Sequence, residues 1–368
     1  MTPPFRIVGA GPAGLAAAIT LAAAGRAVEV FERRRECGAR FGGDLQGLEN
    51  WTADEDAEAE LARTGLDADF YRAPFREGFQ ANGRRVDRMT FPRPAFYLVK
   101  RGRDADTLDQ GLKRRALDAG VHLRLGESCD PATADVLATG PRGRRPFAVD
   151  RGVVFRTDAP DLAVAYLDDR VAYKGYAYLL VTGGYGCLCT MLFDRFAELG
   201  RAFADARTAL LDRWPIRRWD ERPVGGVGHW AGVPTWTSGR TLVVGEAAGL
   251  QDFLWGFGIR AALRSGVLAA RALLDAPASA PAGASSEAAV AYTAAADAAF
   301  GPFLRGGVVN RALWEAGRVA RYAPTMTALR WGGPYALLRA LHRDTPVQRA
   351  LYPAARRYVR RAYPHLAV

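Results

Sequence analysis

Residues 5–32 constrain the fold most strongly, because they place a glycine-rich turn between a short apolar strand and a helix. The first strand is FRIVG, the helical run is LAAAITLAAAG, and a second strand, AVEVFERR, ends at Glu32. Strand, glycine turn, helix, strand and terminal acid in this order predict a dinucleotide-binding unit. The alternative is a glycine-rich turn that holds no ligand.

The turn itself, GAGPAG at residues 9–14, follows the GxGxxG pattern. The first glycine is expected to make the tight turn, the second to let the backbone approach a pyrophosphate, and the third to let the helix close onto the strand. The helix N-terminus supplies positive potential to the phosphates. The predicted cofactor contacts here are Gly9, Gly11, Pro12, Ala13 and Gly14.

The acid at the end of the second strand is placed to bind a ribose. Glu32 lies 18 residues beyond Gly14, so its carboxylate is expected to accept hydrogen bonds from a ribose diol. An acid at this position argues against a 2′-phosphate, although Arg33 and Arg34 beside it weaken that inference. The pattern does not separate NAD from FAD.

Three further segments carry a resemblance to a known family. They are LVKRGRDADTLDQGL at 98–112, DVLATG at 135–140 and GEAAGLQDFLWGFGIRAALRSG at 245–266. Together with GAGPAG, they resemble the geranylgeranyl reductase family of FAD-dependent oxidoreductases, within the para-hydroxybenzoate hydroxylase-like flavoproteins. The resemblance spans most of the chain to about residue 275 and implies FAD as the cofactor.

The resemblance also implies residue roles. Arg101, ahead of the Leu108-Asp109 pair, is expected to reach FAD from a strand end, and Glu246 to accept hydrogen bonds from the ribityl chain. A helix beginning at Ile259 would place its N-terminus at the isoalloxazine. Aromatic hydroxylases of the wider superfamily usually have an Asp-Gly pair near this place, and this chain has Thr139-Gly140-Pro141 instead, which argues against a hydroxylase-type handling of NADPH. The implied contacts are Arg33, Arg101, Thr139, Gly140, Gly245, Glu246, Ala247, Gly256, Gly258 and Ile259.

The fold class expected is α/β, or α+β overall, with a Rossmann-like FAD-binding domain, a β-sheet substrate domain and a helical C-terminal part. The FAD-binding domain is predicted to be discontinuous. We assign 1–50, 97–150 and 238–276 to the FAD-binding domain, 51–96 and 151–237 to the substrate domain, and 277–368 to the C-terminal region.

Two turns and an aromatic-rich strand mark the substrate domain. Asn82-Gly83 and Gly183-Gly184 indicate hairpins. GYAYLLV resembles the strand by which geranylgeranyl reductases line an apolar tunnel, here with Tyr176 and Tyr178. Five tryptophans suggest an apolar pocket near the flavin, although for any one of them a place in the core is the better interpretation. They are Trp214, Trp219, Trp230, Trp236 and Trp255.

The catalytic residue is not identified by any pattern, since no nucleophile arrangement has a recognisable local signature. The candidates are Trp255, Tyr178 and His229, although a lone histidine is more often a core residue. Cys37 receives no catalytic role, and Asp252 is expected either to cap a turn or to face the substrate. In the loop at 41–51, the candidate contacts are Asp44, Gln46, Glu49 and Trp51.

Charge and cysteine content bear on partners. The net charge of +11 is carried almost wholly by arginine, and the stretch from Leu304 onward is strongly basic. This stretch predicts peripheral contact with an anionic membrane, binding of a phosphorylated substrate, or a solvated helical face.

The four cysteines lack metal spacing, so no metal site is expected. No recognition motif points to nucleic acid. The first apolar run lacks the features of a signal peptide, and we interpret the four cysteines as reduced thiols of a cytoplasmic protein, with a peripheral place at the inner face of the membrane as the alternative.

Three functions fit these observations. The first is reduction of carbon–carbon double bonds of an isoprenoid or other apolar substrate by hydride from reduced flavin, with NAD(P)H or a reduced carrier protein as electron donor. The second is a flavin-dependent monooxygenase or halogenase-like enzyme acting on an apolar or aromatic substrate. The third is a flavin-binding, membrane-associated protein without turnover. The substrate and the oligomeric state are not predicted.

Overall fold

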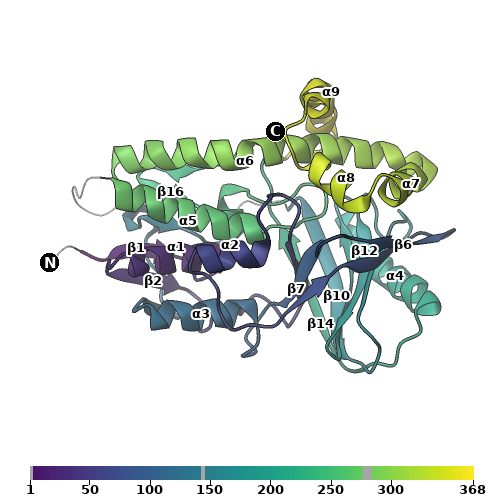
Figure 1. Ribbon diagram of the computed structural model, residues 1–368, viewed down its shortest axis with the longest axis horizontal. Helices are drawn as coiled ribbons and strands as arrows, with labels where there is room; N and C mark the ends of the chain where they lie inside the picture. The colour runs from purple at the N-terminus through teal and green to yellow at the C-terminus, as the bar shows by residue number, and fades with distance from the viewer. Residues whose placement is uncertain (1–2, 142–145, 277–283) are drawn as a thin grey trace.

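A computed structural model describes residues 3–141, 146–276 and 284–368, which form three sheets and a helical C-terminal part (Figure 1). The mixed α/β architecture and the helical C-terminal part confirm the predicted fold class. The helices are α1 (Pro12–Ala23), α2 (Ala57–Arg63), α3 (Leu108–Asp118), α4 (Leu199–Arg213), α5 (Ile259–Asp275), α6 (Ser286–Gly317), α7 (Ala323–Trp331), α8 (Pro334–Leu341) and α9 (Pro346–Ala362).

The first sheet contains the predicted dinucleotide-binding unit. Five of its strands run parallel, and one short edge strand is antiparallel. Parallel strands buried on both faces favour β-branched residues, and Ile7 and Val30 are fully buried here. The strand order is β15 (Thr237–Ser238), β16 (Thr241–Val243), β9 (Val136–Leu137), β1 (Phe5–Val8), β2 (Val28–Glu32) and β8 (His122–Leu125).

The other two sheets form the second half of the molecule. The larger sheet packs α4 against one face through a separate apolar core. Its order is β14 (Trp219–Gly228), β10 (Ala148–Arg156), β13 (Tyr185–Leu192), β12 (Tyr176–Thr182), β11 (Leu162–Tyr166), β5 (Glu77–Ala81) and β6 (Val86–Thr90). The small sheet has the order β3 (Leu45–Glu49), β7 (Phe96–Lys100) and β4 (Arg72–Phe75), so it joins residues on both sides of the boundaries predicted at 50 and 96. The boundary predicted at 150 falls inside β10.

Close packing of α1 against α5 brings the two glycine-rich motifs together. A methyl group on Gly266 of α5 would lie 2.1 Å from the carbonyl oxygen of Ala13 in α1. One on Gly14 would lie 2.0 Å from the carbonyl oxygen of Gly9. These contacts leave no room for a side chain, which explains the small residues of both helices.

Both predicted hairpins are confirmed, but the turn of one of them is longer than the two residues that its sequence predicts. Gly183 and Gly184 have φ of 55° and 74° and join β12 to β13 by a two-residue turn, as their sequence predicts. β5 and β6 are joined instead by a four-residue loop, 82–85. Within it, the Asn82 side chain accepts hydrogen bonds from the backbone N–H groups of Arg84 and Arg85, so the asparagine acts through its side chain.

The C-terminal part is helical, as predicted, with α6 running along both halves of the molecule (Figure 1). Pro334 and Pro346 begin α8 and α9, and Pro324 lies in the first turn of α7. The prolines at 324, 334, 346 and 353 predict four breaks between helices, and the last of these predictions is wrong, because Pro353 lies inside α9. It is exposed there, so water can satisfy the carbonyl that the proline leaves without a donor. The Ala/Pro/Ser composition of DAPASAPAGASSE, 275–287, predicts a linker before α6, and 277–283 within it lie outside the described residues.

Candidate functional site

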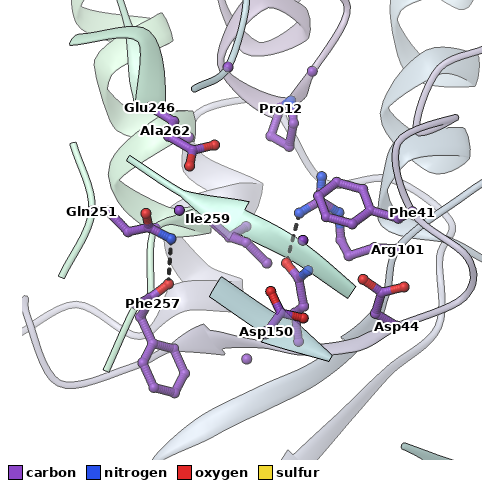
Figure 2. A pocket seen from close by; sticks show the side chains of 18 of the residues that line it. Pro12, Phe41, Asp44, Arg101, Asp150, Glu246, Gln251, Phe257, Ile259 and Ala262 are labelled. Atoms are coloured by element: carbon purple, nitrogen blue, oxygen red, sulfur yellow. Dashed lines mark hydrogen bonds between the residues drawn. The ribbon is translucent and has the colours of Figure 1, made fainter. Parts of the chain in front are cut away.

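A cavity of about 870 Å³ lies where the three sheets meet, and most of the predicted site residues line it. The predicted residues absent from its wall are Gly14, Gly245, Ala247 and His229. Figure 2 shows part of this cavity, with Pro12 and Glu246 on one side and Asp150 and Phe257 on the other. The predicted residues that line the cavity are Gly9, Gly11, Pro12, Ala13, Glu32, Arg33, Arg101, Thr139, Gly140, Tyr178, Glu246, Trp255, Gly256, Gly258 and Ile259.

The GAGPAG turn forms one end of the cavity. Gly9 has a φ of 104°, and a methyl group there would lie 2.3 Å from the carbonyl oxygen of Ala138. By contrast, a methyl group on Gly11 would meet no atom within 4 Å. Gly11 is the N-cap of α1 and makes no side-chain cap, so the first N–H groups of this helix face open space beside the cavity. This end therefore offers an anion the positive end of a helix.

Glu32 ends β2 at the same end of the cavity. Its carboxylate accepts hydrogen bonds from the backbone N–H of Ala10 at 3.0 Å and of Arg34 at 2.9 Å. These two bonds orient the carboxylate, and each oxygen keeps a second lone pair for a further donor. Arg33 and Arg34 also line this region.

Glu246 lies in a short 3₁₀ helix, Gly245–Ala248, after β16. Its carboxylate pairs with Nη1 of Arg40 at 3.0 Å and accepts the backbone N–H of His229 at 2.9 Å. The Arg40 guanidinium also donates to the carbonyl of Val227. His229 therefore reaches this network through its backbone, and the structure does not place its side chain on the cavity wall.

Arg101 begins the segment after β7 and is almost fully buried. Its guanidinium forms two hydrogen bonds with Asp109, at 2.8 and 2.9 Å, and a third with the Gln46 side chain at 2.9 Å. It also lies 4.1 Å from the ring centroid of Phe41. The Leu108-Asp109 pair does open α3, as predicted, and its acid neutralises Arg101. Arg101 therefore positions Gln46 and Phe41 at the cavity wall, and Figure 2 shows its side chain beside the Phe41 ring.

The N-terminus of α5 meets the middle of the cavity. Its N-cap, Gly258, makes no side-chain cap, and Gly258 and Ile259 both line the wall. The preceding loop is held by Asp252, which accepts the backbone N–H groups of Leu254 at 3.0 Å and Trp255 at 2.9 Å. Asp252 does not line the cavity, so of its two predicted roles the structure assigns the turn cap.

A buried histidine, His342, lies beside the Asp252 carboxylate. His342, the C-cap residue directly after α8, places Nε2 3.6 Å from Asp252 Oδ1, and its Nδ1 lies 2.8 Å from the carbonyl oxygen of Leu338. Burial lowers the pKa of the His342 imidazole, but the hydrogen bond and the charge of the Asp252 carboxylate have the larger combined effect. The pKa of His342 is therefore raised. The pair ties the C-terminal helices to the loop beside the cavity.

The other half of the cavity is apolar and aromatic. Tyr176 and Tyr178 of β12 line it, as expected, and the Tyr176 hydroxyl donates to the carbonyl of Trp255 at 2.5 Å. Trp51 and Trp255 meet edge to face, with ring centroids 6.0 Å apart. Three contributors come from the C-terminal helices, and no sequence pattern predicts them: Trp314, Leu329 and Leu338.

Only Trp255 of the five tryptophans predicted to form the pocket lines the cavity. Trp230 stacks on Phe253 at 3.8 Å inside the core, and Trp236 donates from Nε1 to Asp297 at 2.6 Å. Trp219 is exposed, and Trp214 packs against the second apolar core. These four have the core or surface roles that isolated aromatics usually have.

The loop candidates divide in the same way. Asp44, Gln46 and Trp51 line the cavity, whereas Glu49 accepts hydrogen bonds from the backbone of Trp51 and Thr52 and stabilises a turn. Cys37 is buried outside the wall, and burial raises the pKa of its thiol to about 12, which keeps it protonated.

Sequence reasoning missed several lining residues between the two halves, namely Arg40, Phe41, Asp150, Gln251 and Phe257. Asp150 was detectable in the sequence, because the residues on its face of β10 at 148, 152 and 154 are Ala, Gly and Val, so an acid stands out among them. Burial, followed by the charge of Asp44, raises the pKa of Asp150 to about 6. Burial likewise raises the pKa of Asp44. The junction of the cavity therefore holds two carboxyl groups that resist ionisation.

The comparisons with known proteins agree with this fold. The NAD(P)-binding Rossmann-like domain model matches residues 7–44, and no curated protein matches the chain. A geranylgeranyl bacteriochlorophyll reductase-like protein from Thermoplasma acidophilum superposes with a TM-score of 0.64 at 17% identity, covering 98% of this chain and 96% of that one. The chain has the fold of FAD-dependent oxidoreductases.

Two further similar structures belong to other flavin enzymes. The flavin-dependent brominase Bmp2 gives a TM-score of 0.65 at 15% identity, covering 97% of this chain and 99% of that one. A 2-methyl-3-hydroxypyridine-5-carboxylic acid oxygenase gives 0.54 at 16% identity, covering 94% and 97%. The fold is thus shared by a reductase-like protein, a halogenating enzyme and an oxygenase.

None of the helices in the described ranges has the length and apolar character that crossing a membrane requires.

Proposed function

We propose that the protein binds FAD and reduces carbon–carbon double bonds of an isoprenoid or other apolar substrate. One observation carries this proposal: a single cavity runs from the GAGPAG turn to an aromatic, apolar half. Such a cavity would hold a dinucleotide and an apolar molecule in contact. Ligand sites of this kind are mostly apolar, with a few placed polar groups.

The residues present fit FAD. Gly11 leaves open space at the uncapped N-terminus of α1, which suits a pyrophosphate. Glu32 keeps lone pairs for a ribose, and Glu246 does so for the ribityl hydroxyls. Gly258 opens a second uncapped helix at the middle of the cavity, where its positive end would stabilise a negatively charged reduced flavin ring.

Bound reduced flavin would supply a hydride. The chain would orient the substrate and exclude water from the site. Tyr176, Tyr178, Trp51, Trp255 and Trp314 line the apolar half, so their rings exclude water from the reacting double bond. The loop 252–257 is held by Asp252, which keeps Gly256 beside the junction. Neither NAD(P)H nor a reduced carrier protein is favoured as electron donor by any contact.

A flavin-dependent monooxygenase or halogenase-like enzyme is the second candidate. The similarity to the brominase, with a TM-score of 0.65, supports it as well as the similarity to the reductase-like protein supports reduction. The apolar half accepts an aromatic substrate equally well. A flavin-binding protein without turnover needs the same cradle, so it is the third candidate.

One experiment separates the three. The purified protein is loaded with FAD, reduced, and mixed with total lipid extract with and without oxygen, and the products are analysed by mass. An anaerobic gain of two hydrogens per double bond supports the reductase. A product that gains one oxygen atom, or a halogen when halide is present, and only with oxygen, overturns it. Reoxidation of flavin with no changed product supports binding without turnover.

We also propose that the C-terminal helices contact an anionic membrane surface and that the lipid substrate reaches the cavity there. Leu329 of α7 and Leu338 of α8 line the apolar half, and Trp331 between them is 75% exposed. Val347 at the start of α9 is 67% exposed. An exposed tryptophan and valine among arginines suit a lipid headgroup boundary.

A further inference from the structure

Asp150 occupies the junction between the two halves of the cavity. It lies on β10, opposite Gly226 of β14 and Met191 of β13, and all three residues line the cavity. Its side chain shares a strand face with Ala148, which also lines the wall. An acid on a strand face that otherwise carries small and apolar residues has no evident packing role.

On the cofactor side, Asp150 lies near the residues proposed to hold the flavin. A methyl group on Gly226 would lie 3.2 Å from Oδ1 of Asp150 and 3.9 Å from Nη2 of Arg40, the partner of Glu246. A methyl group on Gly256 would lie 3.5 Å from the sulfur of Met191. Asp150 is therefore separated by one side chain from the Gly256 turn, where the flavin ring is proposed to bind.

On the substrate side, Asp150 faces the aromatic half. Met191, its neighbour on β13, pairs in turn with Tyr176 on β12, so the three side chains follow one row across the sheet. Residues directly opposite in an antiparallel pair have Cβ atoms about 5 Å apart. A double bond held between Gly256 and Tyr176 would thus lie within reach of the Asp150 carboxyl group.

Most other acids of the cavity wall have charged partners, and Asp44 accepts the backbone N–H of Gly42 at 3.0 Å. Glu246 is paired with Arg40, Asp109 with Arg101, and Glu32 accepts two backbone N–H groups. The Tyr176 hydroxyl donates to a carbonyl, and burial raises its pKa. Among the described residues, Asp150 forms no salt bridge, and its raised pKa of about 6 leaves an appreciable protonated share near neutral pH.

We propose that Asp150 is the acid that protonates the substrate during reduction. This inference rests on the proposed function. One carbon of the double bond accepts a hydride, which carries the two electrons lost by reduced flavin. The O–H bond of Asp150 breaks, and its proton forms a C–H bond at the other carbon, so the double bond becomes a single bond. The Asp150 carboxylate then regains a proton from solvent.

Several titratable groups surround Asp150, and they set the pH range in which it acts. Arg40 favours the carboxylate, whereas Asp44 favours the protonated form. Cys189 and the two tyrosines stay neutral at the pH of interest, because burial raises the pKa of Tyr178 and a hydrogen bond from Cys187 together with burial raises that of Cys189. The facing groups are Arg40 from the loop after β2, Asp44 before β3, Tyr176 and Tyr178 from β12, and Cys189 from β13.

The test compares the FAD-loaded wild type with Asp150→Asn, Asp44→Asn and a matched control, Asp158→Asn, on the exposed loop after the same strand. Geranylgeraniol is the probe, with the total lipid extract as a second probe, and oxidation of reduced flavin is followed without oxygen from pH 5 to 9. Without any substrate, infrared spectra over the same range record the carbonyl band of protonated carboxyl groups. Both readouts use the full chain.

The expected results are specific to Asp150. Asp150→Asn lowers the rate of flavin oxidation by about 100-fold or more, the effect typical of losing a general acid, and removes the fall in rate above about pH 6. It also removes an infrared carbonyl band that titrates near pH 6. Asp44→Asn moves both transitions to lower pH, because a neighbouring negative charge is lost. Asp158→Asn changes neither.

Failure of this inference differs from failure of the proposed function. If the wild type reduces double bonds and Asp150→Asn does so within threefold, with the same pH profile, only the role of Asp150 is overturned. If the wild type reduces no double bond in either probe, the proposed function fails and the inference fails with it. A titrating band that persists in Asp150→Asn also overturns the inference.

Discussion

Arg40 and Glu246, 206 residues apart in the chain, form an ion pair with 3.0 Å between Nη1 and Oε2 at the cavity wall. The pair joins the loop after β2 to the 3₁₀ helix after β16. The two motifs that resemble flavin-binding segments therefore meet through side chains as well as through the packing of α1 on α5.

Replacing Glu246 tests its proposed contact with the ribityl chain. Glu246→Ala should weaken FAD binding by about tenfold or more, since a charged acceptor is lost and Arg40 is left without this partner. Glu246→Asp keeps the acceptor and should bind FAD more tightly than the alanine variant. Fluorescence titration of the apoprotein measures both. A variant Glu246→Ala that keeps its flavin and loses only turnover would show that the assigned role is wrong.

Enlarging Gly266 tests the close approach of α1 and α5. Gly266→Ala places a methyl group 2.1 Å from the Ala13 carbonyl oxygen, so the helices must separate. We expect a loss of about 2–3 kcal/mol in the free energy of unfolding, measured by urea denaturation. The matched control is Gly200→Ala in α4, where the nearest atom lies at 3.5 Å and the change should be small. Equal stability of the two variants would contradict this packing.

Replacing Arg311 tests the link between α6 and the loop beside the cavity. The buried Arg311 donates to the carbonyls of Phe253, Leu254 and Lys174. Arg311→Met should lower the free energy of unfolding by about 3 kcal/mol, because the buried carbonyls of Phe253 and Leu254 lose their donor, whereas that of Lys174 keeps Nε1–H of Trp314. The exposed Arg103, changed to Met, is the control, and thermal unfolding reports both. A loss no larger than that of Arg103→Met would exclude this role.

The pH dependence of stability tests the environment of Asp150 without any substrate. Its pKa is about 6 in the folded protein and near 3.8 in the unfolded chain. Because the raised pKa disfavours the folded, charged form, wild-type stability falls as the pH rises through about 6. Asp150→Asn should therefore be more stable than the wild type at pH 8, by about 3 kcal/mol, and this difference should shrink toward pH 4. A difference that is the same at both pH values would contradict the shift.

The proposed membrane contact predicts binding that depends on charge. Arg357 and Arg361 are exposed, and neither has an ion-pair partner within the described parts of the chain. The double variant Arg357→Gln/Arg361→Gln should bind phosphatidylserine vesicles roughly 30-fold more weakly, at about 1 kcal/mol for each arginine. Cosedimentation measures this, with Arg103→Gln as control. Equal binding of wild type and double variant would exclude α9 as the contact.

The cofactor end of the cavity was predictable from the sequence because its constraints are local. Gly9 and Gly11 act through backbone geometry within one turn, and Gly183-Gly184 specify a two-residue hairpin in the same way. The same holds for Ile259, which begins α5 directly after a glycine. Short-range steric rules leave few alternatives at such positions.

The substrate end was predictable only in part, because distant segments build it. Leu329 and Leu338 reach the cavity through the packing of α7 and α8, which no local pattern encodes. Trp230 and Trp236, near the flavin motif in sequence, pack in the core instead. Sequence proximity therefore overstated their part in the site. Asp150, which shares its strand face with Ala148, Gly152 and Val154, was overlooked.

The central claim is that one cavity holds FAD and an apolar substrate in contact, and spectroscopic titration tests it most directly. The apoprotein is titrated with FAD and then with geranylgeraniol, while the visible spectrum of the flavin is recorded. The account predicts one FAD for each chain and a further spectral shift when geranylgeraniol fills the aromatic half. FAD binding with no response to apolar ligands, or no FAD binding at all, would contradict it.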